Sequence, residues 1–209
     1  MKLRRVLTVA GCLLAVAFLG RQVFSQHEEP EEQGQPQMSE EEAKMWEAIT
    51  KAGTPGEHHK HLEPLVGTWK VHSRYRMSPE AEWGESTGTG KFEWIMDGRY
   101  ILEHIEATME GMPLPFRGLG ILGYDNIANK HFSVWIDNMS TGTMTSTGTC
   151  DDSGKTITYY GETPDAVTGQ MRKEKSVQRV INDNKHVFQM FKRDDAGKEY
   201  LSLEVTYTR

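Results

Sequence analysis

The sequence predicts an all-β domain, an antiparallel up-and-down barrel of about ten strands preceded by short helices. From residue 64 onward, apolar and polar side chains alternate with a period of two, as in strands with one buried and one solvated face. Short turn sequences rich in Asp, Asn and Gly separate these segments. No helical segment connects them as parallel strands would require, and a ten-strand meander removes its exposed edges most economically by closing into a barrel.

The chain begins with the features of a secretory signal peptide, which we assign to residues 1–25. Basic residues precede an uninterrupted apolar stretch at 6–20, and compact residues at 23–25 suit a cleavage site. The apolar stretch is shorter than a membrane-spanning helix. We therefore expect an exported protein, periplasmic or secreted, with no stable membrane insertion after cleavage. A lipoprotein-like box ends at Cys12, but cleavage there would leave an apolar new terminus.

The composition of the mature chain argues against some partners. Cleavage would remove four of the 24 Lys and Arg residues and none of the 30 Asp and Glu residues, which leaves 20 basic against 30 acidic side chains. Nucleic acids and anionic membranes require clustered basic residues, so we expect neither as a partner. Cys150 would be the only cysteine left, so no internal disulfide is expected. The core must therefore stabilise the fold.

An acidic linker and a first helix precede the strands. Residues 26–38 are polar, acidic and interrupted by proline, which predicts a disordered linker. Ser39 and Glu42 form the Ser-x-x-Glu pattern of a capping box. A stripe of apolar residues at helical spacing, including Trp46, then runs to Gly53, where the helix is expected to end.

A second short helix is predicted to begin at Thr54, with a proline in its first turn, and to cover one end of the barrel. The helices together occupy residues 39–63, and the barrel occupies residues 64–209. His58 and His61 share one face of this second helix and are capable of binding a metal ion. Because no third ligand is evident nearby, we predict no metal site.

The ten predicted strands cover residues 65–75, 86–96, 99–109, 115–124, 130–138, 142–150, 155–161, 171–181, 185–193 and 198–209. The fourth strand contains Gly118, Gly120 and Gly123 in the spacing of a dinucleotide-binding motif. That motif works only where a strand turns into a helix, and here another strand follows. We therefore interpret these glycines as allowing a sharply coiled strand at a barrel corner.

Gly67-x-Trp69 at the start of the first strand resembles the opening motif of the calycin superfamily, the lipocalins and their relatives. The chain more closely resembles DUF1579, a bacterial family of unknown function, over roughly residues 53–209. The matching segments are 55–58, 65–69, 98–100, 120–125, 135–137 and 204–209. The resemblance implies a calycin-like barrel and no particular activity. It also implies that Arg209 lies across Trp69 in a cation–π contact that closes the barrel.

Aromatic and polar residues on several strands indicate a site inside the barrel. Alternation places His104 with Glu106, and Trp135 with Asp137. If these faces point inward, they form aromatic walls with a few polar groups, which suits a small apolar or aromatic ligand. The alternative is a packed core, since the opposite face of the His104 strand is equally apolar. The predicted ligand-binding residues are Tyr75, Trp94, His104, Glu106, Tyr124, Trp135 and Asp137.

Three uses of this fold stay open. The first is an exported binding barrel without a cofactor; a haem-binding variant, as in the nitrobindin-like branch of calycins, would need an inward histidine, His104 or His186. The second is a hydrolase or isomerase in which His104 acts with Asp137 or Glu106 as acid and base. The third is an interaction module in which the acidic linker and the Trp46 helix bind a partner. The sequence favours a protein that is not an enzyme.

Overall fold

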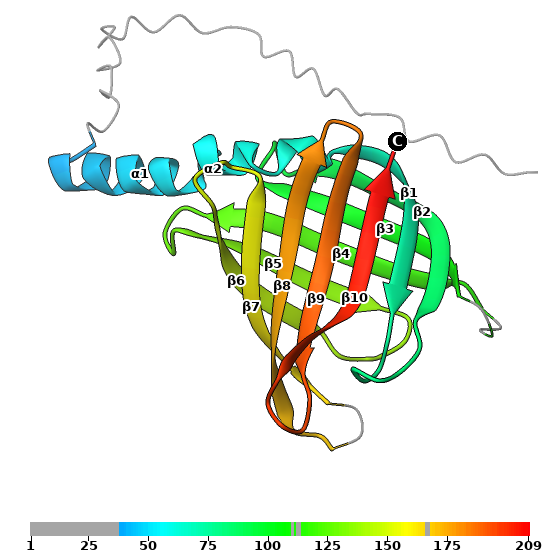
Figure 1. The fold of residues 1–209 in the computed structure, drawn as a ribbon. Coiled ribbons are helices and arrows are strands. Elements are labelled where there is room, and N and C mark those ends of the chain that lie inside the picture. The colour runs from blue at the N-terminus through cyan, green and yellow to red at the C-terminus, as the bar shows by residue number, and fades with distance from the viewer. Residues whose placement is uncertain (1–37, 110, 112–113, 166–167) are drawn as a thin grey trace, which may run out of the picture. The chain divides into compact units, whose positions relative to one another are not determined.

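The computed structural model describes residues 38–109, 111, 114–165 and 168–209. The predicted leader and almost all of the predicted linker therefore lie outside the described residues. The described chain contains two helices, α1 (Glu40–Gly53) and α2 (Glu57–Lys60), and a 3₁₀ turn, η1 (Glu63–Leu65) (Figure 1). No described helix has the length and apolar character needed to span a bilayer. The strands are β1 (Gly67–Tyr75), β2 (Gly84–Ile95), β3 (Tyr100–Met109), β4 (Phe116–Asp125), β5 (Lys130–Asp137), β6 (Met144–Cys150), β7 (Thr156–Pro164), β8 (Met171–Asn182), β9 (Lys185–Arg193) and β10 (Glu199–Thr208).

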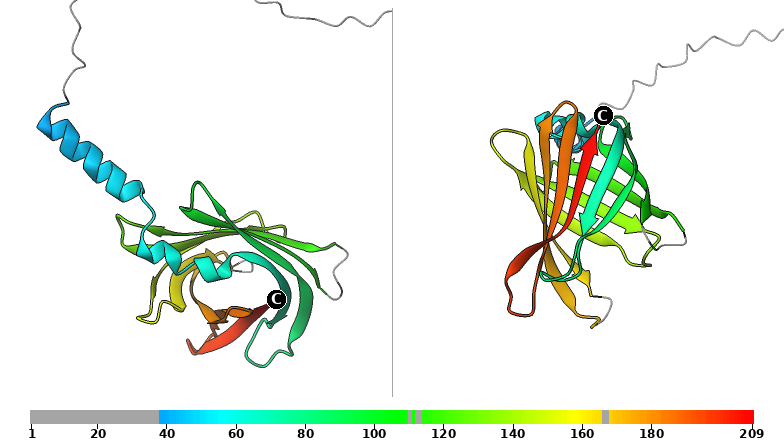
Figure 2. Two further views of the ribbon diagram at one scale, coloured as in Figure 1. Left: turned by 90° about the horizontal axis from the view of Figure 1, so that it is seen from above. Right: turned by 45° about the vertical axis from the view of Figure 1, so that its right-hand side comes forward.

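The ten strands form one closed barrel in which every neighbouring pair is antiparallel. Each strand pairs with the next in the sequence, and β1 pairs with β10 (Figure 2). The closing register aligns Lys70 with Thr208 and Tyr75 with Leu203. The predicted fold class and strand order are thus confirmed, and the predicted strand bounds agree closely with the observed ones.

The most deeply buried core lies at the end of the barrel that α2 and η1 cover, which we call the capped end. Alternate residues of β1 point inward, so Trp69 and Val71 are buried whereas Lys70 is exposed. Leu62 and Leu65, only 0% and 1% exposed, pack in the same cluster as Trp69. Seen from above, the cyan helical segment crosses this end (Figure 2). The prediction that the second helix covers one end is therefore confirmed.

Helix α1 begins at the predicted capping box. The Ser39 amide donates to the Glu42 carboxylate (2.8 Å), and the Glu42 amide donates to Ser39 Oγ (3.2 Å). None of its residues is buried, and Met45, Trp46 and Ile49 are about half exposed. The helix is thus specified locally, by its cap and its acidic first turn, rather than by packing.

Helix α2 begins later than predicted. The Thr54 hydroxyl donates to the Thr50 carbonyl (2.6 Å) and so closes α1, which leaves it unable to cap the next helix. Gly56 is the N-cap of α2, and its amide donates to Nδ1 of His59 (3.1 Å). The His59 ring therefore accepts the hydrogen bond at the N-terminus of α2, where the N-cap glycine has no side chain.

Candidate functional site

Inward-facing side chains change from buried to half-exposed between the capped end and the opposite, far end of the barrel. On β9, His186 near the capped end is buried, whereas Phe188 and Met190 are half-buried. On β7, Tyr159 is buried and Thr163, nearer the far end, is half-buried. The same change runs along β5, from the buried His131 to the half-buried Trp135. Alternation along the strands places these side chains on the inner face of the barrel.

This far half of the interior, which we call the accessible interior, has mainly apolar and aromatic walls. The rings of Phe116 and Trp135 are stacked with centroids 6.4 Å apart. Half-buried apolar residues of β9 and β10 pack against the buried core from the other side of the barrel. The half-buried apolar and aromatic residues of these walls include Phe116, Trp135, Phe188, Met190 and Leu203.

Two glycines of β4 leave room for the ring of Trp135. A Cβ atom at Gly118 would lie 2.1 Å from that ring, and one at Gly120 would lie 3.3 Å from it. Trp135 Nε1 donates to Asp137 Oδ2 (2.9 Å), which holds the ring in this orientation. The segment that matches the dinucleotide pattern continues as a strand, as predicted. Its glycines at 118 and 120 permit close approach of an aromatic side chain.

A carboxyl group, that of Glu103, lies at the inner limit of the accessible interior. It points inward from β3 and is 8% exposed. Its Oε1 accepts a hydrogen bond from the Tyr207 hydroxyl (3.0 Å), and its Oε2 borders Gly120, which also contacts Trp135. Burial raises the pKa of Glu103 to about 7, and the Tyr207 hydrogen bond limits the rise. At neutral pH this group can therefore either donate or accept a hydrogen bond.

A second polar group in the interior lacks a partner. The hydroxyl of Tyr159 is buried and makes no hydrogen bond with any described residue. A buried hydroxyl left in this state costs about 1–3 kcal/mol, so such groups are usually satisfied by water or by a ligand. Burial raises the pKa of Tyr159 above its ordinary value, and the neighbouring Cys150 and Glu103 raise it further.

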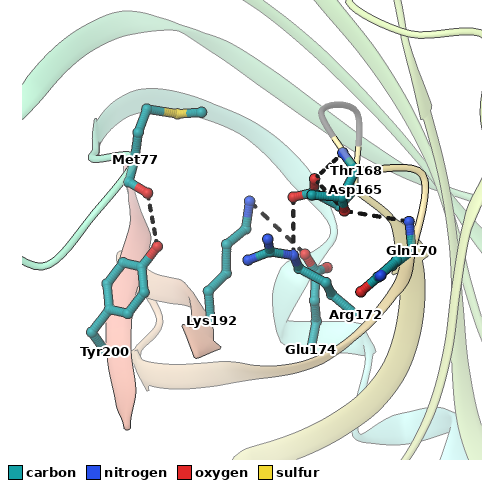
Figure 3. A network of polar contacts seen from close by, with 8 residues as sticks. All are labelled: Met77, Asp165, Thr168, Gln170, Arg172, Glu174, Lys192 and Tyr200. Atoms are coloured by element: carbon teal, nitrogen blue, oxygen red, sulfur yellow. Dashed lines mark hydrogen bonds and ion pairs between the residues drawn. The ribbon is translucent and has the colours of Figure 1, made fainter. Parts of the chain in front are cut away.

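Charged side chains line the strands near the far end (Figure 3). Arg172 Nε lies 3.0 Å from Asp165 Oδ2, and Lys192 Nζ lies 3.9 Å from Glu174 Oε1. The Tyr200 hydroxyl donates to a backbone carbonyl in the β1–β2 connection (2.9 Å). Arg172 and Lys192 thus each have an acidic neighbour. The far end of the barrel is therefore polar, whereas the walls of the accessible interior are mainly apolar.

The predicted ligand-binding residues lie in different parts of the barrel. Trp135 and Asp137 face the accessible interior, and Tyr75 ends β1 on the inward side at the far end. Trp94 packs against the core near the capped end. Tyr124 lies beneath α2, with its ring stacked on that of His58 at 4.3 Å. The predicted set is therefore spread along the whole length of the barrel.

The expectation that His104 and Glu106 line the interior is wrong. Both are exposed on the outer face of β3, where Glu106 Oε1 lies 3.6 Å from Arg117 Nε and the two residues share a surface depression with Leu119 and Ile136. Both faces of this strand carry apolar residues, so alternation alone left its direction undecided. The inward carboxyl is that of Glu103, and no pattern in the sequence distinguishes it.

The histidines considered for haem do not fit that group. His104 lies on the outer wall, and His186 is 0% exposed. The His186 ring is enclosed by the rings of Trp69, Phe92 and Tyr207, with centroids at 4.4, 5.4 and 4.1 Å. An axial ligand needs the porphyrin directly beside its imidazole nitrogen, and this packing leaves no space for one.

A cluster around Trp69 closes the capped end. The Arg209 guanidinium lies 3.9 Å above the Trp69 ring and donates a hydrogen bond to the Val66 carbonyl. Trp69 Nε1 donates to the Leu65 carbonyl (2.7 Å). Gly67 adopts a φ of 132°, where a Cβ atom would lie 3.0 Å from Arg209 Nη2. Glycine is therefore required beneath the guanidinium.

A closed antiparallel barrel of ten strands, covered by a helix at one end, defines a calycin-like protein. The family model described as "Protein of unknown function (DUF1579)" matches residues 54–209. The chain therefore belongs to the DUF1579 family. A search of curated proteins finds no match.

Solved structures resemble this barrel at low sequence identity. The crystal structure of Rv2717c from M. tuberculosis is 15% identical, with a TM-score of 0.54, and the match covers 75% of this chain and 99% of that chain. A redesigned beta barrel, b11L5F_LGL, is 14% identical with a TM-score of 0.38, and the match covers 71% of this chain and 94% of that chain. EF1p2_mFAP2b, solved bound to DFHBI, is 14% identical with a TM-score of 0.39, and the match covers 73% of this chain and 99% of that chain. The similarity to Rv2717c supports the fold alone.

Proposed function

We propose that this protein binds a small apolar or aromatic molecule in the accessible interior of its barrel. The observation that carries the proposal is the half-exposure of inward-facing side chains in a barrel whose strands are fully paired. Apolar walls with a few convergent polar groups, one of them with a shifted pKa, are typical of ligand sites. Together with the predicted signal peptide, this makes the protein an exported carrier or receptor.

The polar groups of the interior favour a ligand with one uncharged hydrogen-bonding group at its inner end. Glu103 can donate to a carbonyl or accept from a hydroxyl, and the Tyr159 hydroxyl offers a further hydrogen bond. The rings of Phe116 and Trp135 offer apolar surface against which a flat molecule can stack. Arg172 and Lys192 already have acidic neighbours, so a strongly anionic ligand is not favoured.

The experiment uses neighbouring residues on β6 that face opposite sides of the wall. Ser146 is half-buried on the inward face, and Thr145 is exposed on the outer face. The apolar dye N-phenyl-1-naphthylamine, titrated into the purified protein, should become fluorescent on binding. Ser146→Phe should fill part of the interior and weaken the dye's affinity about tenfold or more, which is about 1.4 kcal/mol. Thr145→Phe is the matched control and should leave the affinity unchanged.

Two results would contradict the proposal. Equal dye affinity in Ser146→Phe and the wild-type protein would place the dye outside the barrel. A wild-type protein that neither enhances the fluorescence nor carries a dissociable extra mass in native mass spectrometry would have a filled interior.

A further inference from the structure

Three side chains that are far apart in the sequence, and that can each ligate a metal, converge at the capped end. His61 directly follows α2, His131 is the second residue of β5, and Cys150 is the last residue of β6. Their ligand atoms all lie within 4.8 Å of one another. We propose that these three residues form a binding site for a divalent transition-metal ion, Zn²⁺, with two imidazole nitrogens and one thiolate as ligands.

The spacing of the two histidines fits a tetrahedral ion. His61 Nδ1 lies 3.3 Å from His131 Nε2. With Zn–N bonds of about 2.0–2.1 Å, two ligands of a tetrahedral zinc ion are separated by about 3.3–3.4 Å. A thiolate at about 2.3 Å from zinc lies ~3.6 Å from each nitrogen, so a small rotation of Cys150 completes the set. Three protein ligands leave the fourth position for water.

The surroundings of these side chains suit a bound ion. His131 is 1% exposed, and its Nε2 is the ring nitrogen that faces His61 Nδ1. The wall of the site is completed by Gly154 in the β6–β7 turn, where a Cβ atom would lie 3.3 Å from the His61 ring. A bound ion would replace the contact between the two rings with a bond to each ring nitrogen and to the Cys150 sulfur. Binding would release the thiol proton to solvent.

The other histidines of α2 have different contacts. His59 Nδ1 accepts the hydrogen bond from the Gly56 amide, and His58 is exposed with its ring stacked on Tyr124. The sequence by itself predicts no metal site, because no third ligand lies near the helix along the chain. The missing ligands come from β5 and β6. An ion held there would link the covering helix to the barrel wall.

The test is a Co²⁺ titration of the purified mature protein, residues 26–209, in the presence of a reductant that contains no thiol. One equivalent of Co²⁺ should produce a thiolate-to-cobalt charge-transfer band together with the visible bands of tetrahedral cobalt. Added Zn²⁺ should displace the Co²⁺ and remove these bands. Cys150→Ser should abolish the charge-transfer band, and His61→Ala should weaken binding about tenfold or more. Cys150 is the only cysteine of residues 26–209, so loss of the band reports Cys150. His58→Ala, on the same helical turn, is the control and should bind Co²⁺ as the wild type does.

The proposal fails if saturating Co²⁺ gives no thiolate band, or if Cys150→Ser binds as the wild type does. It also fails if His58→Ala and His61→Ala lose affinity equally, because the ion would then sit on the helix surface. Thermal denaturation gives a second readout, since an ion that binds only the folded state raises the melting temperature. Zn²⁺ should raise it in the wild type and not in Cys150→Ser.

Discussion

Glu103 and His104 are adjacent in the sequence, but they lie on opposite sides of the barrel wall. His104 is exposed to solvent, whereas Glu103 is buried beside Trp135 and accepts a hydrogen bond from Tyr207. Burial disfavours the charged carboxylate, so the folded state holds a proton that the unfolded chain would release. Protonation at this one residue therefore affects both the stability of the fold and the chemistry of the accessible interior.

Glu103→Gln should remove a pH-dependent part of the stability. The carboxyl has an ordinary pKa of 4.5 and a pKa of about 7 in the folded protein, so the folded state binds more protons between these values. The free energy of unfolding of the wild type should therefore fall as the pH rises from about 4.5 to about 7, by ~3 kcal/mol. The loss is complete above that range. Glutamine does not titrate, so the free energy of unfolding of the variant should rise relative to that of the wild type across this pH interval.

Urea denaturation at several pH values measures this difference. Glu106→Gln makes the same substitution on the outer face of the same strand and is the matched control. If the stability difference between Glu103→Gln and the wild type stays constant from pH 4.5 to pH 7.5, the carboxyl is not held protonated by the fold.

At the scale of elements, β4 shows how a strand makes space for its neighbour. Gly118 and Gly120 lie opposite Asp137 and Trp135 of β5, and the Trp135 ring covers the glycine backbone. A strand with larger residues here would push the ring into the accessible interior. The glycines of β4 therefore help to set the width of the proposed ligand site.

Gly118→Ala should destabilise the protein by about 1–3 kcal/mol, because the new methyl group overlaps the Trp135 ring. In a Trp135→Ala background the overlap is gone and the cost of the same substitution should be much smaller. Chemical denaturation of the four proteins in this cycle measures the coupling. Gly142→Ala is the control, since a Cβ atom there has only Ser140 Oγ nearby, at 3.8 Å. Equal costs in both backgrounds would show that the ring does not need this glycine.

Helix α1 is an element whose formation depends on local interactions. Its capping box forms as predicted, yet it buries none of its residues. Its C-terminal end is held to the barrel by Asn126, whose side-chain amide donates to the carbonyls of Ala52 (2.9 Å) and Thr54 (2.8 Å). The apolar stripe around Trp46 therefore stays accessible, which keeps the interaction-module interpretation open.

At the scale of the whole molecule, closure of the barrel joins the first strand to the last. The pairing of β1 with β10 brings residues at opposite ends of the domain together, and Arg209 adds a contact to Trp69 just beyond it. Closure removes both free edges of the sheet. The same contact completes the capped end, where Leu62, Leu65 and Trp69 are almost fully buried.

Arg209→Ala should lower the melting temperature without changing dye binding in the far half. The lost cation–π contact and the charged hydrogen bond to the Val66 carbonyl together contribute about 1–2 kcal/mol. In a domain of this size that corresponds to roughly 2–8 °C. Differential scanning calorimetry measures the shift. Arg209→Lys keeps the charge but loses the planar group and should be intermediate; an unchanged melting temperature in Arg209→Ala would rule out a role in closure.

Much of the fold was predictable because its signals are local. Alternation along segments such as 69–75 and turns such as Asp97–Gly98 depend only on neighbouring residues, and they located all ten strands. The candidate site was predictable in part. Trp135 was expected inside, but the inward direction of Glu103 was not, because both faces of β3 are apolar. The metal ligands were missed for a different reason, since His131 and Cys150 are far from His61 in the sequence.

The amino-acid sequence by itself determined the class of fold, the order of the strands and the cap of α1, because backbone geometry and turn chemistry act over a few residues. Only the tertiary structure decided which face of β3 points inward, how far the core extends from the capped end, and which distant side chains meet. Those outcomes depend on the register and closure of the whole barrel. A residue's environment there is set by strands that are remote in the sequence, and no local pattern encodes it.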